Sequence, residues 1–167
     1  QIINSVATWI LKKRIHQMEL FLKYPHEVQE ELLFNLIKSS ENTQLGKKYD
    51  FSSMKSYTTF SERIPVSTYE ELEPLIEKTR QGEQNVFWHS NIKWFAKSSG
   101  TTNAKSKFIP VSSEALENCH YKASKDLLCL YLNNNEESQM FTGKSLRLGG
   151  SKQLYEDNNT FFGDLSA

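Results

Sequence analysis

The spacing of the apolar residues changes near Val86, and this change constrains the fold more than any other feature of the chain. Before Val86, apolar residues recur every three or four positions, which is the period of a helix with one buried face. After it come short runs of aromatic and β-branched residues, which are typical of strands. We therefore predict an α/β protein with a helical part over residues 1–84 and a sheet-containing part over residues 85–167, both belonging to one large domain.

Four segments fit the helical period: residues 2–23, residues 25 to about 40, a segment that begins at residues 67–70 and ends at Gly82, and residues 112 or 113 to about 133. Residues 67–70 read Ser-Thr-Tyr-Glu, which fits a capping box, and Gly82 fits the position after a helix end. Gly46, in the polar stretch before them, fits a helix stop. The last helix has a predicted core face made of Leu116, Cys119, His120, Ala123, Leu127 and Leu130.

Strand-like segments surround and follow a loop rich in small residues. We predict strands over residues 86–88, 92–96, 107–111, 139–142, 145–148, 153–155 and 160–162. The loop itself covers residues 98–107. Pro110 lies in the strand after the loop, which favours a strand end or a sheet edge.

Charge and cysteine content exclude several classes of protein. Twenty Lys and Arg balance twenty Asp and Glu, so nothing steers the chain to nucleic acid or to an anionic membrane surface. No apolar run approaches the roughly 20 residues that span a bilayer.

Cys119 and Cys129 would lie about 15 Å apart along one helix, which is too far for a disulfide. A reducing, cytoplasmic location is expected. The first residues have no initiator Met and no secretory signal, and both ends suggest a piece of a longer protein.

The loop over residues 98–107 is the part of the chain that points to chemistry. Six of its ten residues are Ser, Thr or Gly, and two are Lys. Small residues let backbone N–H groups approach a phosphate closely, hydroxyls add donors, and lysine adds charge. The spacing is not that of a Walker loop, which needs Gly-Lys five residues after its first Gly. The alternative is a hairpin loop that joins two strands and binds nothing.

The residue string itself carries a resemblance. Ser98-Ser99-Gly100-Thr101-Thr102, followed by Lys107, resembles the phosphate-binding loop of adenylate-forming enzymes, such as acyl-CoA synthetases and luciferases. The longer string over residues 95–110, in which Pro110 follows Lys107 by three positions, resembles one branch more closely. That branch is the plant auxin-responsive acyl-acid amido synthetases and their bacterial relatives. Residues 60–70 and residues 148–151 resemble the same branch. The resemblance covers essentially the whole chain, as the opening portion of such an enzyme.

The resemblance implies an incomplete large domain, in which a helical segment packs on the beginning of a mixed sheet with flanking helices. It implies a ligase that uses ATP and Mg²⁺ to activate a small carboxylic acid and then joins the acyl group to an amino acid. The residues it assigns to the ATP phosphates are Ser98, Ser99, Gly100, Thr101, Thr102 and Lys107, with a weaker role for Lys105. It assigns no catalytic side chain and no metal ligand within these residues. Asn103 and Ala104 stand where the superfamily usually has a second glycine.

Two other functions remain open at this point. One is a ligase that forms an acyl-CoA thioester. The other is a non-catalytic fragment or binding module of the same fold. A sheet edge left exposed in the chain would also allow two copies to pair as a dimer.

Overall fold

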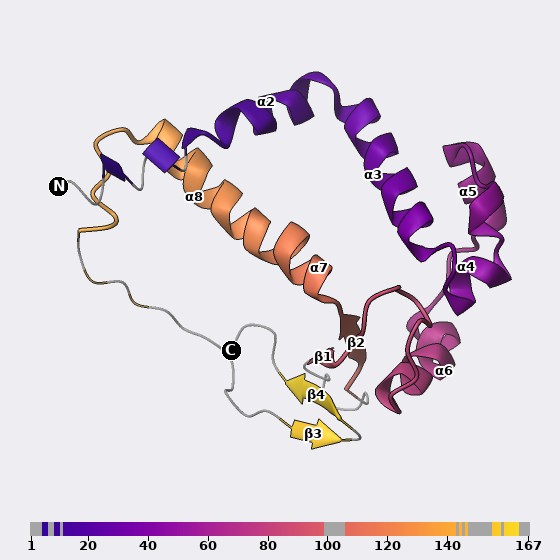
Figure 1. Ribbon diagram of the computed structural model, residues 1–167. Helices are drawn as coiled ribbons and strands as arrows, with labels where there is room; N and C mark the ends of the chain where they lie inside the picture. The colour runs from indigo at the N-terminus through magenta and orange to yellow at the C-terminus, as the bar shows by residue number, and fades with distance from the viewer. Residues whose placement is uncertain are drawn as a thin grey trace. The chain divides into compact units, whose positions relative to one another are not determined.

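The computed structural model describes residues 5–6, 9–10, 12–98, 106–142, 144, 146, 155–157 and 159–163. They belong to two compact units, which are drawn in Figure 1. The first unit contains residues 1–29 and 114–148, and the second contains residues 30–113 and 149–167. The division predicted from the sequence at residue 84 stays a prediction.

The first unit is built on two helices that pack against each other. Helix α2 (Ile15–Lys23) contacts helix α8 (Lys122–Asn134). Helix α7 (Ser113–Ala115) and a π-helical stretch, η2 (Leu116–Tyr121), lead directly into α8. The predicted long helix is thus confirmed over residues 113–134, with wider turns near its start. The helix predicted over residues 2–23 is confirmed over α2, and residues 5–6, 9–10 and 12 are also helical.

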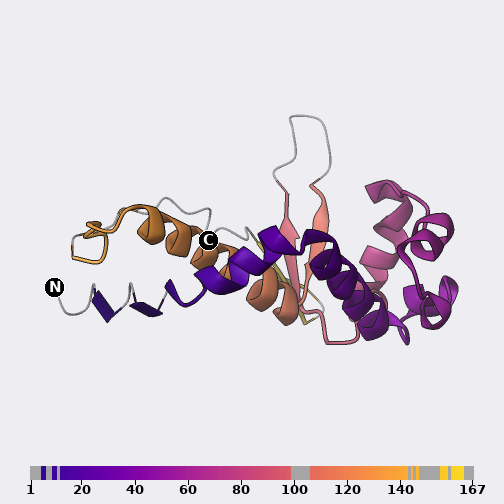
Figure 2. The ribbon, with the colours of Figure 1, turned by 90° about the horizontal axis from the view of Figure 1, so that it is seen from above.

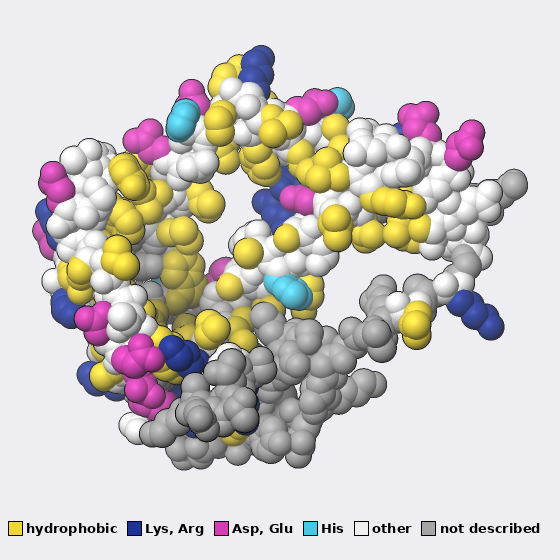
Figure 3. Space-filling model, turned by 180° about the vertical axis from the view of Figure 1, so that it is seen from behind, with side chains coloured by type: hydrophobic (Ala, Val, Ile, Leu, Met, Phe, Trp, Pro, Cys, Tyr) yellow, Lys and Arg dark blue, Asp and Glu magenta, His cyan; other side chains and the backbone are white. Residues whose placement is uncertain are grey.

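The predicted core face of α8 is wrong. Leu127 and Leu130 are 68% and 43% exposed, whereas Cys129 and Leu132 are 0% and 1% exposed. Cys119 and His120 are exposed as well. Apolar residues occur around most of this helix, so the helical period alone could not choose between its faces. Figure 3 shows hydrophobic side chains at the surface of the helices. Cys119 and Cys129 are not joined by a disulfide, as the spacing predicts.

A bidentate ion pair joins α2 to α8. Arg14, at the start of α2, donates from Nε and Nη2 to the two carboxylate oxygens of Asp126, at 2.7 and 3.1 Å. The side chains are 16% and 22% exposed. The fork geometry of a guanidinium suits such a pair. The Arg14 hydrogen bond is the main reason that the pKa of Asp126 lies below its usual 3.8.

This pair predicts a stability that depends on pH. Because folding lowers the pKa of Asp126, its contribution is present above about pH 4 and is lost as the pH falls through the folded-state value. We expect Asp126→Asn to lower the free energy of unfolding by about 1 kcal/mol at pH 7, and by less at pH 3. Urea unfolding at the two pH values measures this. Glu136→Gln, which removes the exposed partner of Lys12, is the control. An equal loss at both pH values would contradict the prediction.

Among its described residues, the second unit contains five helical segments. They are the greater part of α3 (Pro25–Ser40), α4 (Gln44–Lys48), the 3₁₀ turn η1 (Phe51–Ser53), α5 (Tyr57–Arg63) and α6 (Tyr69–Arg80). Ile37, Phe51 and Met54 form the core between the first four. The sequence predicted α3 and α6, but not the three short segments between them.

Two details of these helices correct the sequence prediction. The capping box of α6 is formed by Thr68 and Glu71, one residue later than predicted: Thr68 Oγ1 accepts from Glu71 N, and Glu71 Oε2 accepts from Thr68 N. Glu70 is therefore not a capping residue. Gly46 does not stop a helix but lies buried inside α4. Gly82 follows the end of α6 with a φ of 95°, as predicted.

The described residues of the second unit also form a mixed four-stranded sheet. Its strands are β1 (Trp94–Lys97), β2 (Phe108–Val111), β3 (Tyr155–Asp157) and β4 (Thr160–Gly163), in the order β2-β1-β4-β3. Strand β1 runs antiparallel to β2 and parallel to β4, and β3 is antiparallel to β4. Figure 2 shows β1 and β2 as the two arms of a hairpin. Ile76 of α6 packs with Ile92 and Phe95 against this sheet.

The structure confirms three of the predicted strands and contradicts two others. Those over residues 92–96, 107–111 and 160–162 are confirmed as β1, β2 and β4. Residues 86–88 are not a strand, because the backbone carbonyls of Asn85 and Val86 accept from Gln44 and Leu45 at the start of α4. Residues 139–142 form a turn that Thr142 N closes on Gln139 O. The predictions over 145–148 and 153–155 fall largely outside the described residues.

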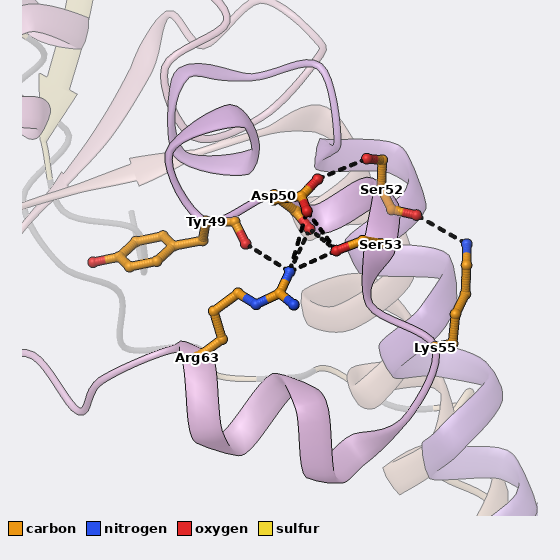
Figure 4. Close-up of polar contacts among 6 residues, drawn as sticks. All are labelled: Tyr49, Asp50, Ser52, Ser53, Lys55 and Arg63. Atoms are coloured by element: carbon orange, nitrogen blue, oxygen red, sulfur yellow. Dashed lines mark hydrogen bonds and ion pairs between the residues drawn. The ribbon is translucent and has the colours of Figure 1, made fainter.

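Arg63 ties together the segment between α4 and α5 (Figure 4). Its Nη1 donates to the carbonyls of Tyr49 and Asp50, at 3.3 and 2.9 Å, and to Ser53 Oγ at 2.7 Å. Asp50 has a left-handed backbone, with φ of 50°, which aspartate tolerates better than most residues. Hydrogen bonds from Ser53 and then Ser52 are the main reasons that the pKa of Asp50 is lowered. We call these contacts the Arg63 network.

Candidate functional site

The predicted phosphate loop begins where the β1–β2 hairpin leaves the sheet. Ser98 N donates to the Lys107 carbonyl at 2.9 Å, and Lys107 N donates to Ser98 Oγ at 3.0 Å. These bonds continue the antiparallel register of β1 and β2 by one pair. The structure thus brings Ser98 and Lys107 together. The other predicted residues, Ser99, Gly100, Thr101, Thr102 and Lys105, lie outside the described residues.

Ser98 has a role that the sequence did not suggest. Its hydroxyl oxygen accepts the backbone hydrogen bond of Lys107, so the side chain closes the base of the hairpin. The position of the Lys107 backbone therefore depends on this hydroxyl. The predicted phosphate contact of Ser98 stays a prediction.

The first turn of α6 holds Lys107 from the other side. Lys107 Nζ donates to Glu70 Oε1 at 2.9 Å and lies 4.7 Å from the centre of the Tyr69 ring. The Tyr69 hydroxyl accepts from Phe108 N at 2.9 Å and donates to the Phe108 carbonyl at 3.4 Å. Tyr69 thus fixes the strand beside Lys107, and Glu70 binds the ammonium.

The charges at this contact are open to solvent. The side chains of Lys107 and Glu70 are 44% and 66% exposed. The hydrogen bond from Lys107 is the main reason that the pKa of Glu70 is lowered. The carboxylate therefore stays ionised at neutral pH, and the charge of the Lys107 ammonium is already paired with it.

A cavity of about 470 Å³ lies beside the base of the hairpin. Its lining residues are Glu73, Glu77, Arg80, Lys97, Ser106 and Phe108. The Arg80 guanidinium donates to both carboxylate oxygens of Glu77, at 2.7 and 3.0 Å, and lies 4.1 Å from the centre of the Phe108 ring. The cavity therefore offers two cations and two carboxylates rather than charge of one sign.

Sequence reasoning missed the roles of Tyr69, Glu70 and Arg80. Tyr69 and Glu70 stood in the string that carried the family resemblance, but the helix-cap interpretation accounted for them. Nothing in the sequence placed Arg80 near the loop. In the part of the chain that the structure describes, no cluster of three His, Cys, Asp or Glu side chains is arranged for a metal ion. No described helix has the length and apolar character needed to cross a membrane.

The family model described as "GH3 family N-terminal domain" matches residues 14–164. The chain belongs to the GH3 family. The match confirms the resemblance to acyl-acid amido synthetases and includes both units, the hairpin and the α6 contact. The chain corresponds to the N-terminal portion of the proteins in that family.

The relatives of the chain carry amido synthetase names. Indole-3-acetic acid-amido synthetase GH3.2 of Arabidopsis thaliana is 31% identical over 106 residues, which are 63% of this chain and 19% of that protein. Jasmonoyl–L-amino acid synthetase JAR4 of Nicotiana attenuata is 28% identical over 144 residues, which are 84% of this chain and 24% of that protein. The chain thus spans about a quarter or less of the length of these relatives.

A solved structure confirms the fold class. The chain matches a GH3.15 acyl acid amido synthetase with a TM-score of 0.80 and 20% identity, over 93% of this chain and 28% of the other. A second structure, AtGH3.15 in complex with 2,4-DB, matches with a TM-score of 0.70 and 22% identity, over 81% and 24%. The helices and the small mixed sheet therefore form part of the acyl-acid amido synthetase fold.

Proposed function

We propose that the complete protein carrying this chain is an ATP-dependent acyl-acid amido synthetase. The observation that carries the proposal is the position of Lys107, at the base of the hairpin loop in a chain of the GH3 family. ATP supplies the adenylyl group: a carboxylate oxygen attacks the α-phosphorus as pyrophosphate leaves, and an amino-acid nitrogen then attacks the acyl carbon, loses a proton and displaces AMP. The two substrates are a small carboxylic acid and an amino acid.

In this proposal the residues of the hairpin bind the phosphates. Lys107 Nζ already donates to an anionic oxygen, that of Glu70, at 2.9 Å, so its position suits a phosphate oxygen too. Ser98 holds the backbone of Lys107, and Ser99, Gly100, Thr101 and Thr102 donate further hydrogen bonds, with a weaker contribution from Lys105. The hydroxyl and N–H donors are worth most where the acceptor is charged.

Several finer predictions belong to the same proposal. ATP would bind together with Mg²⁺, which would neutralise part of the phosphate charge. We also propose a cytoplasmic location for the protein. Two copies of this chain on its own, without the rest of the protein, would pair through an exposed edge of the sheet. Residues 1–84 and 85–167 act as parts of one large domain.

Incubation of the complete protein with ATP, Mg²⁺ and a panel of carboxylic acids tests the function. We expect release of pyrophosphate with at least one acid, and an amide when amino acids are added. Coenzyme A should give no thioester. A thioester product would move the protein to the acyl-CoA ligases. Failure of the folded, complete protein to bind ATP in calorimetry would leave a binding module.

A further inference from the structure

The contact between Lys107 and Glu70 joins two elements that are far apart in the sequence. Glu70 is in the first turn of α6, and Lys107 directly precedes β2. The carboxylate does not belong to the loop and does not take part in the capping box, which uses Glu71. Among the described side chains, the Glu70 carboxylate pairs with the ammonium of Lys107.

We propose that Glu70 is a positioning residue that holds the Lys107 ammonium beside the base of the hairpin and lowers the affinity of this ammonium for phosphate. This inference rests on the proposed function, in which Lys107 binds the phosphates of ATP. It assigns to helix α6 a part in setting how tightly ATP and pyrophosphate bind.

The geometry gives Glu70 this effect on any bound phosphate. A lysine ammonium has three N–H donors, and Glu70 takes one of them at 2.9 Å. A phosphate that uses the remaining donors would lie next to the negative carboxylate, and the two anions would repel each other. A phosphate that displaces Glu70 must instead break an existing ion pair. Both arrangements weaken binding relative to an unpaired lysine.

Tyr69 also contacts the Lys107 ammonium. The hydroxyl of Tyr69 makes two hydrogen bonds with the Phe108 backbone, so its ring stays beside the strand. The ammonium lies 4.7 Å from the centre of this ring, and a cation is attracted to the face of an aromatic ring. Lys107 can therefore exchange Glu70 for a phosphate without leaving its place next to β2.

Glu70→Gln in the complete protein tests the inference, since glutamine keeps the shape and removes the charge. We expect the Kd of ATP and of pyrophosphate, measured by calorimetry, to fall about two- to fivefold, as suits an exposed pair. The KM for ATP should fall with it, without a rise in kcat. Glu62→Gln, which removes the same charge from an exposed position on α5, is the matched control and should change neither Kd.

A double-mutant cycle and chemical labelling provide readouts that a merely structural role would not move. In a Lys107→Met background, Glu70→Gln should change the Kd of pyrophosphate by a smaller factor than it does in the unaltered protein, because the lysine through which it acts is absent. In the ligand-free protein, Glu70→Gln should raise the rate at which an N-hydroxysuccinimide ester acylates Lys107, read by peptide mass spectrometry. Labelling requires no ATP and no turnover.

The outcomes separate the inference from the function on which it rests. If the unaltered protein binds ATP and Glu70→Gln changes neither Kd nor labelling, the inference is overturned and the proposed function stands. If Glu70→Gln raises the Kd of ATP or of pyrophosphate, Glu70 favours phosphate binding, and the inference is overturned as well. If the unaltered protein binds neither ATP nor pyrophosphate, the proposed function is overturned and the inference falls with it.

Discussion

Replacement of Lys107 with methionine in the complete protein is expected to lower ATP–pyrophosphate exchange about ten- to a hundredfold. Methionine keeps a long unbranched side chain but removes the ammonium, and a hydrogen bond to a charged group is worth about 1.5–3 kcal/mol. The backbone contacts of residue 107 with Ser98 do not depend on the side chain of Lys107. The hairpin should therefore keep its base, and the loss should fall on phosphate binding.

The matched control is Lys93→Met. Lys93 is also exposed, and it lies next to the opposite end of β1, where its carbonyl accepts from Phe161 N. Its loss should leave the exchange rate unchanged. Equal rates for Lys107→Met and the unaltered protein, with the same carboxylic acid, would rule out the phosphate role of Lys107.

Gly46→Ala is expected to destabilise the second unit by about 3 kcal/mol. A Cβ at this position would lie 2.0 Å from the Ser40 carbonyl oxygen and 2.8 Å from that of Glu41. Both obstacles are backbone atoms, so no side chain can turn aside. Thr43 prevents a shift of α4, because its hydroxyl donates to the Ser40 carbonyl at 2.6 Å and accepts from Gly46 N at 3.0 Å. The gain in helix propensity that alanine brings, about 1 kcal/mol, is smaller than the energetic cost of this overlap.

Urea unfolding of the protein measures the effect of Gly46→Ala as a lower midpoint with an unchanged slope. Lys47→Ala is the control, since Lys47 is exposed on the same helix and its replacement adds no atom to the core. An unaltered midpoint for Gly46→Ala would show that α4 and the end of α3 can separate without cost.

The sequence predicted elements whose signals are local. Pro25 marks the start of α3, Gly82 the end of α6, and apolar strand residues flank the loop on both sides. The local sequence does not determine which side of α8 is buried. Cys129 and Leu132 are buried, whereas Leu127 and Leu130 on the same helix are exposed. The segment between α3 and α6 was missed because its short helices depend on single polar contacts. Thr43 and Ser56 cap two of them.

The candidate site could likewise be predicted only where its signal is local. Residues 98–107 could be singled out by their composition, because hydroxyls, glycine and lysine have a direct chemical use. The partner of Lys107 could not, since Glu70 lies on another element and the pair exists only when α6 packs beside the hairpin. A shift of one residue in the capping box also hid it, because Glu71 rather than Glu70 binds the helix start.

The Arg63 network has a consequence for the order in which the second unit forms. All its partners, from Tyr49 to Ser53, lie close to Arg63 in the sequence. Strand β1, in contrast, pairs in parallel with β4, so that Trp94 meets Phe161 from the far end of the chain. Contacts between near neighbours close short loops and form quickly, whereas distant pairings must wait for a large loop to close. The segment from α4 to α5 can therefore be in place while a ribosome is still adding the residues of β4.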